Sequence, residues 1–168
     1  MTEESISALV AQVAQSLTRR GWMMATAESC TGGLIAAHCT DLAGSSAWFE
    51  RGFITYSNEA KRELLGVPAS ALEQHGAVSA AVAQAMAEGA LQHSHAQVAV
   101  AVTGIAGPGG AVPGKPVGTV WLGWAWRTDG TQSIGGGTVL LNLSGDRAAV
   151  REATVCAALR KVLELASA

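Results

Sequence analysis

Two short stretches without charge constrain the fold of this chain more than any other feature. Residues 22–27 are apolar apart from one threonine, and residues 96–103 form a largely continuous apolar run. A strand with one solvated face alternates apolar and polar residues, so runs of this kind are typical of strands buried on both faces. Such strands lie inside a sheet that other elements cover from both sides.

Helical and strand patterns alternate along the rest of the chain. Aromatic and β-branched residues predict a strand within residues 45–56, and residues 117–126 and 131–143 predict a hairpin around a turn at 128–130. Apolar residues recurring at three- and four-residue steps predict helices at residues 5–20, 34–42, 58–65, 79–93 and 144–166.

This alternation predicts the fold class. Helices that alternate with buried strands, with one added hairpin, indicate an α/β protein: a three-layer α/β/α sandwich around a mixed, mostly parallel sheet. A length of 168 residues fits a single domain, which we expect to span residues 1–168.

The overall composition excludes several classes of protein. Hydrophobic residues make up 49% of the chain and charged residues only 14%, which excludes intrinsic disorder. A net charge of -2 provides no basic surface for a phosphate backbone, so we expect no nucleic-acid partner. The acidic N-terminus and the lack of an apolar run of about 20 residues predict a cytoplasmic protein without a membrane partner. The scattered Cys30, Cys39 and Cys156 indicate reduced thiols rather than a disulfide framework or a zinc site.

Two glycine-bearing turns follow the buried strands, one at residues 28–33 and the other at 103–110. Ligands of open α/β sheets lie beyond the carboxyl ends of the strands, so both turns are expected to border one pocket. Glycines also serve in plain turns, and Ser29 and Thr31 suit a simple helix cap. The second turn belongs to a loop, residues 104–118, with six glycines and three prolines, which favours a functional loop.

Familiar nucleotide and metal motifs are not supported. Residues 109–115 fit the spacing of a phosphate-binding P-loop, but Pro116 replaces the hydroxyl that binds magnesium, and a strand follows in place of a helix. The four histidines show no paired spacing for a metal. We therefore expect neither a metal nor an organic cofactor.

Nucleophilic catalysis remains, and Ser29 is the candidate nucleophile. It lies at a strand-to-helix turn, where the backbone N–H groups of Gly32 and Gly33 can approach an oxyanion. Lys61 is the candidate base, because a lysine held near apolar groups has a lowered pKa. A solvated lysine at a helix start is the ordinary alternative. Cys30, with Lys61 and Glu28, is a second arrangement that hydrolyses amides, and the residues alone do not choose between the two.

Several longer motifs, taken together and in order, resemble the CinA C-terminal domain family, and the likeness covers nearly the whole chain. The resemblance implies a homodimeric α/β/α enzyme without a metal, which deamidates nicotinamide mononucleotide to nicotinate mononucleotide and ammonia. The matching motifs are residues 27–37, 55–61, 75–79, 101–110, 115–120 and 145–147.

The resemblance also implies a role for individual residues. Ser29 is then the nucleophile, Lys61 its general base, and Tyr56 lies beside this pair and helps to position or relay the proton. The residues that it implies for substrate binding are Thr31, Gly32 and Gly33 near the reacting carbonyl, Thr103 and Gly104 on the nucleotide side, and Arg147 as a phosphate contact.

Two other hypotheses stay open on the sequence. One is a non-catalytic module that binds a nucleotide or a protein partner, in which Lys61 binds phosphate directly. The other keeps amide hydrolysis but assigns it to Cys30.

Overall fold

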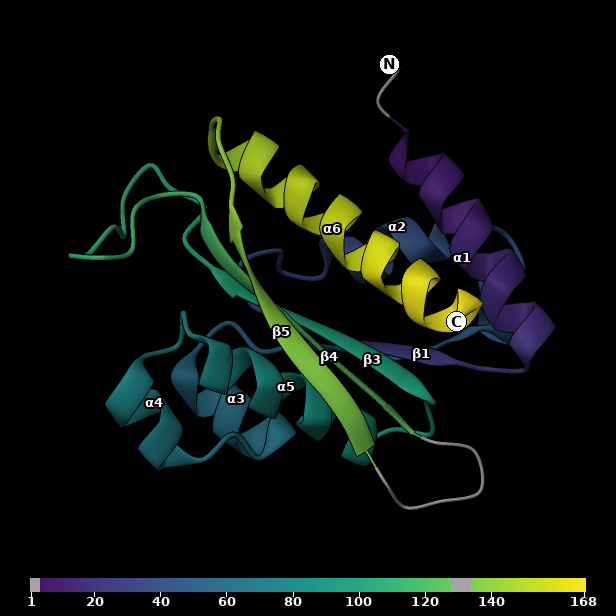
Figure 1. The fold of residues 1–168 in the computed structure, drawn as a ribbon, viewed down its shortest axis with the longest axis horizontal. Helices are drawn as coiled ribbons and strands as arrows, with labels where there is room; N and C mark the ends of the chain where they lie inside the picture. The colour runs from purple at the N-terminus through teal and green to yellow at the C-terminus, as the bar shows by residue number, and fades with distance from the viewer. Residues whose placement is uncertain (1–3, 128–133) are drawn as a thin grey trace.

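The two apolar stretches form neighbouring strands at the centre of the sheet (Figure 1). In the computed structural model, which describes residues 4–127 and 134–168, these strands are β1 (Met24–Glu28) and β3 (Val98–Gly104). They pair in parallel, and every residue of β1 is buried. The predicted double-sided burial is confirmed.

The sheet of the described residues has five strands in the order β2-β1-β3-β4-β5. The edge strand β2 (Phe49–Ile54) pairs in parallel with β1. On the other side β4 (Thr119–Arg127) is antiparallel to β3, and β5 (Ile134–Asn142) is antiparallel to β4. All strands except β4 therefore point the same way, as predicted for a mixed, mostly parallel sheet. The turn predicted at 128–130 lies outside the described residues.

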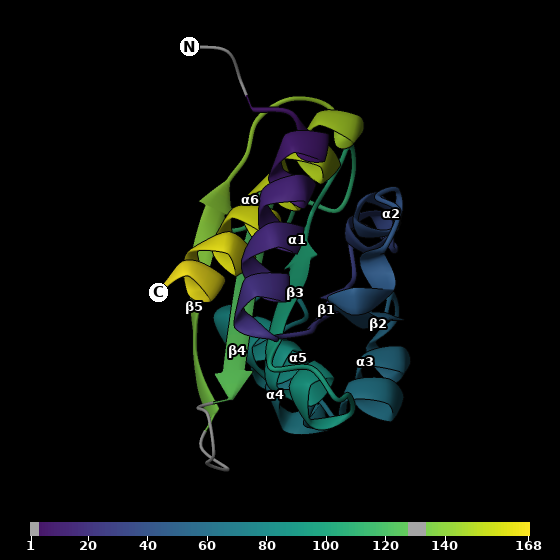
Figure 2. The ribbon, with the colours of Figure 1, turned by 90° about the vertical axis from the view of Figure 1, so that its right-hand side faces the viewer.

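Helices cover both faces of the sheet, which confirms the three-layer α/β/α sandwich (Figures 1 and 2). One layer holds α1 (Ile6–Arg20), α2 (Leu34–Thr40) and α6 (Arg147–Ser167). The opposite layer holds α3 (Asn58–Leu65), α4 (Ala69–His75) and α5 (Ala80–Gln92).

Strand β3 shows why the two layers differ. Its side chains alternate in direction, so Val98, Val100 and Val102 face the core with α1 and α6, while Ala99 and Ala101 face α5. The small alanine side chains let α5 approach the sheet closely. A Cβ on Gly123 of β4 would meet the backbone oxygen of Ala83 in α5 at 2.5 Å.

Helix α4 was not predicted from the sequence. It has only seven residues, its N-cap is Pro68, and it buries one side chain, that of Leu72. A single buried position gives no periodic signal. The strand predicted within 45–56 also begins later, at Phe49, because a short 3-10 helix occupies Ser45–Ala47.

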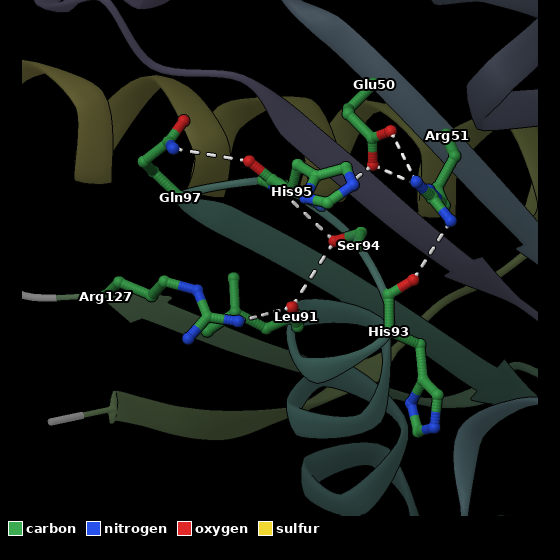
Figure 3. Close-up of polar contacts among 9 residues, drawn as sticks. Glu50, Arg51, Leu91, His93, Ser94, His95, Gln97 and Arg127 are labelled. Carbon is green, nitrogen blue, oxygen red and sulfur yellow. Dashed lines mark hydrogen bonds and ion pairs between the residues drawn. The ribbon is translucent and has the colours of Figure 1, made fainter. Parts of the chain in front are cut away.

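A polar cluster joins the C-terminal end of α5 to the sheet at the amino ends of β2 and β3 (Figure 3). The Arg51 guanidinium donates to both carboxylate oxygens of Glu50, at 2.7 and 2.8 Å, and also to the His93 carbonyl. These bonds from Arg51 lower the pKa of the Glu50 carboxyl. Arg127 donates to the Leu91 carbonyl at 2.7 Å. The two arginines thus donate hydrogen bonds to backbone carbonyls at the end of α5. The cluster lies at the opposite end of β2 and β3 from their carboxyl ends.

Candidate active site

The carboxyl ends of the three parallel strands bring several of the predicted site residues together. Ser29 directly follows β1, and its amide donates to the Val102 carbonyl of β3 at 3.1 Å. Thr55 directly follows β2, and its amide donates to the Glu28 carbonyl at 2.8 Å. These two bonds extend the sheet pairing into the loops, so the backbone that carries Ser29 is tied on both sides.

Lys61 reaches this edge because of how α3 begins. The Ser57 side chain caps the helix by accepting from the Ala60 amide at 3.0 Å. Lys61 and Leu65 lie four residues apart on one face of the helix, and both are buried against the sheet. The Lys61 side chain is 1% exposed, so the alternative of a solvated lysine at a helix start is wrong.

The amine of Lys61 has three hydrogen-bond partners. Its Nζ donates to the Ser29 Oγ at 2.9 Å, to the Thr55 carbonyl at 2.8 Å and to the Tyr56 carbonyl at 3.2 Å. A carbonyl oxygen only accepts, so a neutral amine directs its two N–H bonds at the two carbonyls. Its lone pair then faces the hydroxyl of Ser29, as a base for that hydroxyl requires.

Burial lowers the pKa of the Lys61 amine below its ordinary value. Removal of the amine from water disfavours its charged form, and nearby Cys30 opposes the shift only in part. Within the described part of the chain, no carboxylate forms an ion pair with Lys61. A larger fraction of this lysine is therefore neutral near pH 7 than of a solvated lysine.

Cys30 lies beside Ser29 but is a poorer nucleophile. Burial raises the pKa of its thiol to about 11. At pH 7 only about one molecule in ten thousand then carries the reactive thiolate. The site favours the serine over the cysteine.

A cavity of about 220 Å³ opens in front of Ser29 and Lys61. Tyr56 lies at its mouth with 65% of its surface exposed, and its carbonyl accepts the hydrogen bond from Lys61. The lining combines the predicted residues Ser29, Lys61, Tyr56, Thr103, Gly104 and Arg147 with Cys30, Asn58, Ala77, Val78 and Ala106.

Two of the predicted substrate-binding residues are already tied to the backbone. The Thr103 hydroxyl donates to the Ala77 carbonyl at 2.9 Å, which holds the loop before α5 against the cavity. The Arg147 guanidinium donates to the Gly107 carbonyl at 2.7 Å, so this cation stands where the glycine-rich loop meets the cavity.

The structure does not bring Thr31, Gly32 and Gly33 to the lining of the cavity. The Gly32 amide donates to the Ser29 carbonyl at 3.1 Å, and Gly33, at φ 102°, is the N-cap of α2. The Thr31 hydroxyl donates to Glu28 at 2.6 Å. The side chain of Thr31 and the amide of Gly32 therefore shape the turn at residues 28–33, which carries Ser29.

The Glu28 side chain stabilises the same turn. The sequence indicated Glu28 only as a partner for Cys30. Its side chain is fully buried. Besides the Thr31 hydroxyl, it accepts from the amides of Ile35 at 2.9 Å and Ala36 at 3.1 Å, at the start of α2. An N-cap side chain normally lies directly before its helix. Glu28 lies five residues before the N-cap Gly33, so its position in the sequence does not indicate that it caps α2.

The described residues contain no group of three or more histidine, cysteine, aspartate or glutamate side chains that is able to hold a metal ion. In the same residues, no helix has the length and apolar character that crossing a membrane requires.

Comparisons with known proteins agree with this architecture. The model of the CinA C-terminal domain family matches residues 6–166. A protein of Escherichia coli K12 named nicotinamide-nucleotide amidohydrolase PncC is 51% identical over 160 residues, which are 95% of this chain and 94% of that protein. The corresponding protein of Enterobacter agglomerans is 54% identical over 151 residues, 90% of this chain and 89% of its own. Among solved structures, the competence/damage inducible protein CihA from Agrobacterium tumefaciens superimposes with a TM-score of 0.91 at 44% identity, covering 98% of both chains.

Proposed function

The chain belongs to the CinA C-terminal domain family, and on that premise we propose that it is a nicotinamide-nucleotide amidase. It hydrolyses the carboxamide of nicotinamide mononucleotide to nicotinate mononucleotide and ammonia. The observation that carries the proposal is the buried Lys61 amine 2.9 Å from the Ser29 hydroxyl at the floor of a cavity. The relatives named for this activity match the chain over nearly its full length.

The first half of the reaction is attack by Ser29. Neutral Lys61 takes the hydroxyl proton while the Ser29 Oγ forms a bond to the carboxamide carbon. The lysine is then a cation, and it gives this proton to the amide nitrogen as the carbon–nitrogen bond breaks. Ammonia leaves, and the nicotinoyl group remains as an ester on Ser29.

The second half is hydrolysis of that ester. Lys61, neutral again, takes a proton from a water molecule that attacks the ester carbonyl. The carbon–oxygen bond to Ser29 breaks, and the proton returns to the serine oxygen. The Thr55 and Tyr56 carbonyls, which fix two N–H bonds of the amine, keep the base in one place through both halves.

The nucleotide portion of the substrate lies toward the mouth of the cavity. Arg147 is the cation of the lining nearest the glycine-rich loop, and we assign it to the phosphate. Thr103 and Gly104 line the nucleotide side, and Tyr56, beside Ser29 and Lys61, helps to position or relay the proton.

A non-catalytic nucleotide-binding module is the weaker alternative. It needs the Lys61 ammonium to donate to phosphate, but the three hydrogens of an ammonium already have three acceptors here. The family likeness further leads us to propose a cytoplasmic homodimer that works without a metal or an organic cofactor.

Ammonia release from nicotinamide mononucleotide tests the activity, with EDTA present and free nicotinamide as a comparison substrate. We expect turnover of the mononucleotide that EDTA does not reduce, with nicotinate mononucleotide as the co-product. Absence of ammonia from the folded protein contradicts the proposal.

A further inference from the structure

The two edges of the sheet differ in how they are protected from other strands. Edge strand β2 has six residues and carries the charged side chains of Glu50 and Arg51. The other edge strand, β5, has nine residues, pairs with β4 along its whole length, and contains neither a charged residue nor a proline (Figure 2). Proteins normally protect an exposed edge with charges, prolines, bulges or short strands, because its free backbone groups pair readily with another strand. Strand β5 has none of these protections.

The pairing with β4 shows which backbone groups of β5 face outward. The Leu143 amide donates to the Gly118 carbonyl at 2.9 Å, and these two residues continue the register of the β4–β5 pair. In an antiparallel pair, residues that bond to the neighbouring strand alternate with residues that do not. The N–H and C=O groups of the alternate residues therefore face away from β4, at positions 134, 136, 138, 140 and 142. Within the described chain, no backbone group outside β4 bonds to them.

We propose that β5 pairs antiparallel with β5 of a second copy of this chain, across a two-fold axis at Thr138. The two five-stranded sheets then join into one continuous sheet. A two-fold interface uses the same surface of both copies, so residue i of one strand meets residue j of the other and the reverse. Thr138 faces outward, so it pairs with itself through backbone hydrogen bonds. The inference goes beyond the proposed activity, because it assigns the interface of the proposed homodimer to one strand and one register.

The sequence of β5 is complementary to itself in this register. It has three glycines before Thr138, at 135–137, and three large apolar residues after it, at 139–141. Antiparallel pairing about Thr138 places every glycine opposite a large side chain, with 135 opposite 141, 136 opposite 140 and 137 opposite 139. A centre within the glycines sets glycine against glycine, and a centre within 139–141 sets large side chains against each other. The register about Thr138 avoids both.

Two tryptophans of β4 lie behind the glycines and provide an apolar surface for the second copy. A Cβ added at Gly137 would lie 2.7 Å from the ring of Trp124, and one added at Gly135 would overlap the ring of Trp126. The rings therefore occupy the space that side chains at these positions would take. In the proposed register, Val139 of the second copy lies opposite Gly137 on the same face and contacts the Trp124 ring. Aromatic side chains beside edge glycines stabilise strand pairing in this way.

The pairing also covers apolar side chains that are now exposed at the edge. Val139 and Leu140 point to opposite faces of the sheet, and their surfaces are 39% and 40% exposed. Space for the tryptophan rings explains the glycines, but it does not explain these two exposed side chains. An interface about Thr138 covers both, once from each copy. A second copy is therefore the partner that the pattern of β5 fits.

Disulfide cross-linking of Thr138→Cys tests the register. The Cα atoms of a hydrogen-bonded antiparallel pair lie about 5.5 Å apart, which is within the range of a disulfide. We expect mild oxidation of Thr138→Cys to give a covalent dimer on a non-reducing gel. In the control Asn142→Cys the two cysteines are separated by about 26 Å along the strands, so no such dimer should form. The parent protein shows whether its own three cysteines contribute.

Sedimentation equilibrium of Leu140→Lys tests the interface without oxidation. A lysine at an edge opposes strand pairing, so we expect the dissociation constant of the dimer to rise at least about tenfold over that of the parent. The matched control is Leu64→Lys, which places the same charge at an exposed leucine of α3 and should leave the dimer unchanged. Circular dichroism reports the folding of each variant.

A monomeric parent protein overturns the inference. So does a dimer that folded Leu140→Lys does not weaken, or one in which Thr138→Cys cross-links no better than Asn142→Cys. If Leu140→Lys does not fold, the cross-linking result decides. Ammonia release is measured on the same parent protein, so the two proposals fail separately. A dimer that joins through β5 but releases no ammonia refutes only the proposed activity, and an active monomer refutes only the interface.

Discussion

The Nζ of Lys61 lies 2.9 Å from the Oγ of Ser29 although 32 residues separate them in the chain. The two side chains come from neighbouring parts of the sheet edge, one after β1 and the other on the helix after β2. Because β1 and β2 are parallel neighbours, the fold itself brings a buried amine to a serine hydroxyl.

The lowered pKa of Lys61 predicts the pH dependence of activity. The base must be neutral, so kcat/KM should fall as the pH drops through the pKa of this lysine in the folded protein. Its midpoint should lie below the pKa of an ordinary lysine. A pH–rate profile for nicotinamide mononucleotide measures it, and a midpoint at the ordinary lysine value contradicts the assignment.

The same pKa shift predicts the pH dependence of stability. Between the lowered pKa and the ordinary value, the unfolded chain binds a proton on Lys61 that the folded protein does not bind. The free energy of unfolding should therefore rise with pH across this window, and the penalty for burying the charge is complete below it. The two buried thiols, whose pKa is raised, lower the stability of both proteins with pH in part of this range. Urea titrations of the parent and of Lys61→Met should therefore show a difference in the free energy of unfolding, parent minus variant, that rises with pH.

Glu28 should contribute to both stability and activity. In Glu28→Gln an NH2 group replaces one carboxylate oxygen, so a hydrogen-bond donor faces a backbone N–H donor at the start of α2. We expect a loss of about 1–3 kcal/mol in the free energy of unfolding, because buried hydrogen bonds are broken. We also expect a lower kcat, because the turn at residues 28–33, which carries Ser29, moves. The exposed Glu73 on α4 provides the control Glu73→Gln, for which urea denaturation should show little change.

Cys30 should be dispensable for the chemistry. With a thiol pKa of about 11, it should react slowly with iodoacetamide at pH 7, and Cys30→Ala should retain ammonia release within about threefold. Peptide mass mapping after brief alkylation measures the reaction of the Cys30 thiol, and the ammonia assay measures the activity of Cys30→Ala. Abolished turnover in a folded Cys30→Ala protein transfers the nucleophilic role from Ser29 to the cysteine.

Gly89 lets α5 pack closely against α3, the helix that carries Lys61. A Cβ at this position would lie 2.1 Å from the carbonyl oxygen of Leu65, one turn beyond Lys61 on α3. Alanine normally stabilises a helix relative to glycine, but here we expect Gly89→Ala to lower stability by about 1–3 kcal/mol through overpacking. The control Gly109→Ala places a Cβ where no atom lies within 4 Å. A Gly89→Ala protein as stable as the parent contradicts this packing.

Local signals made much of the fold predictable. Helix α3 has the bounds that the sequence predicts, Asn58–Leu65, because Ser57 caps its start and Gly66, in the left-handed region, ends it. The central strands were predictable because burial on both faces leaves a run of apolar residues.

The contacts that hold the site residues in place were not predictable from local sequence signals. The Arg151 guanidinium donates to two carbonyls of the turn at residues 28–33, which are 120 and 121 positions away, so no local spacing records these bonds. Glu28 caps a helix from five residues before its N-cap, and Asn58, Ala77 and Val78 reach the cavity only through the packing of the helices after β2. The family likeness supplied candidate residues, but which of them meet depends on tertiary structure.

Ammonia release by Ser29→Ala and Lys61→Met, with Cys30→Ala as the control, is the most direct test of the proposed serine–lysine mechanism. Each variant is assayed on nicotinamide mononucleotide in EDTA, with folding checked by circular dichroism. We predict that the serine and lysine variants each lose at least about a thousandfold in kcat, while the cysteine variant stays active. Turnover near the parent rate in folded Ser29→Ala or Lys61→Met would contradict the serine–lysine mechanism.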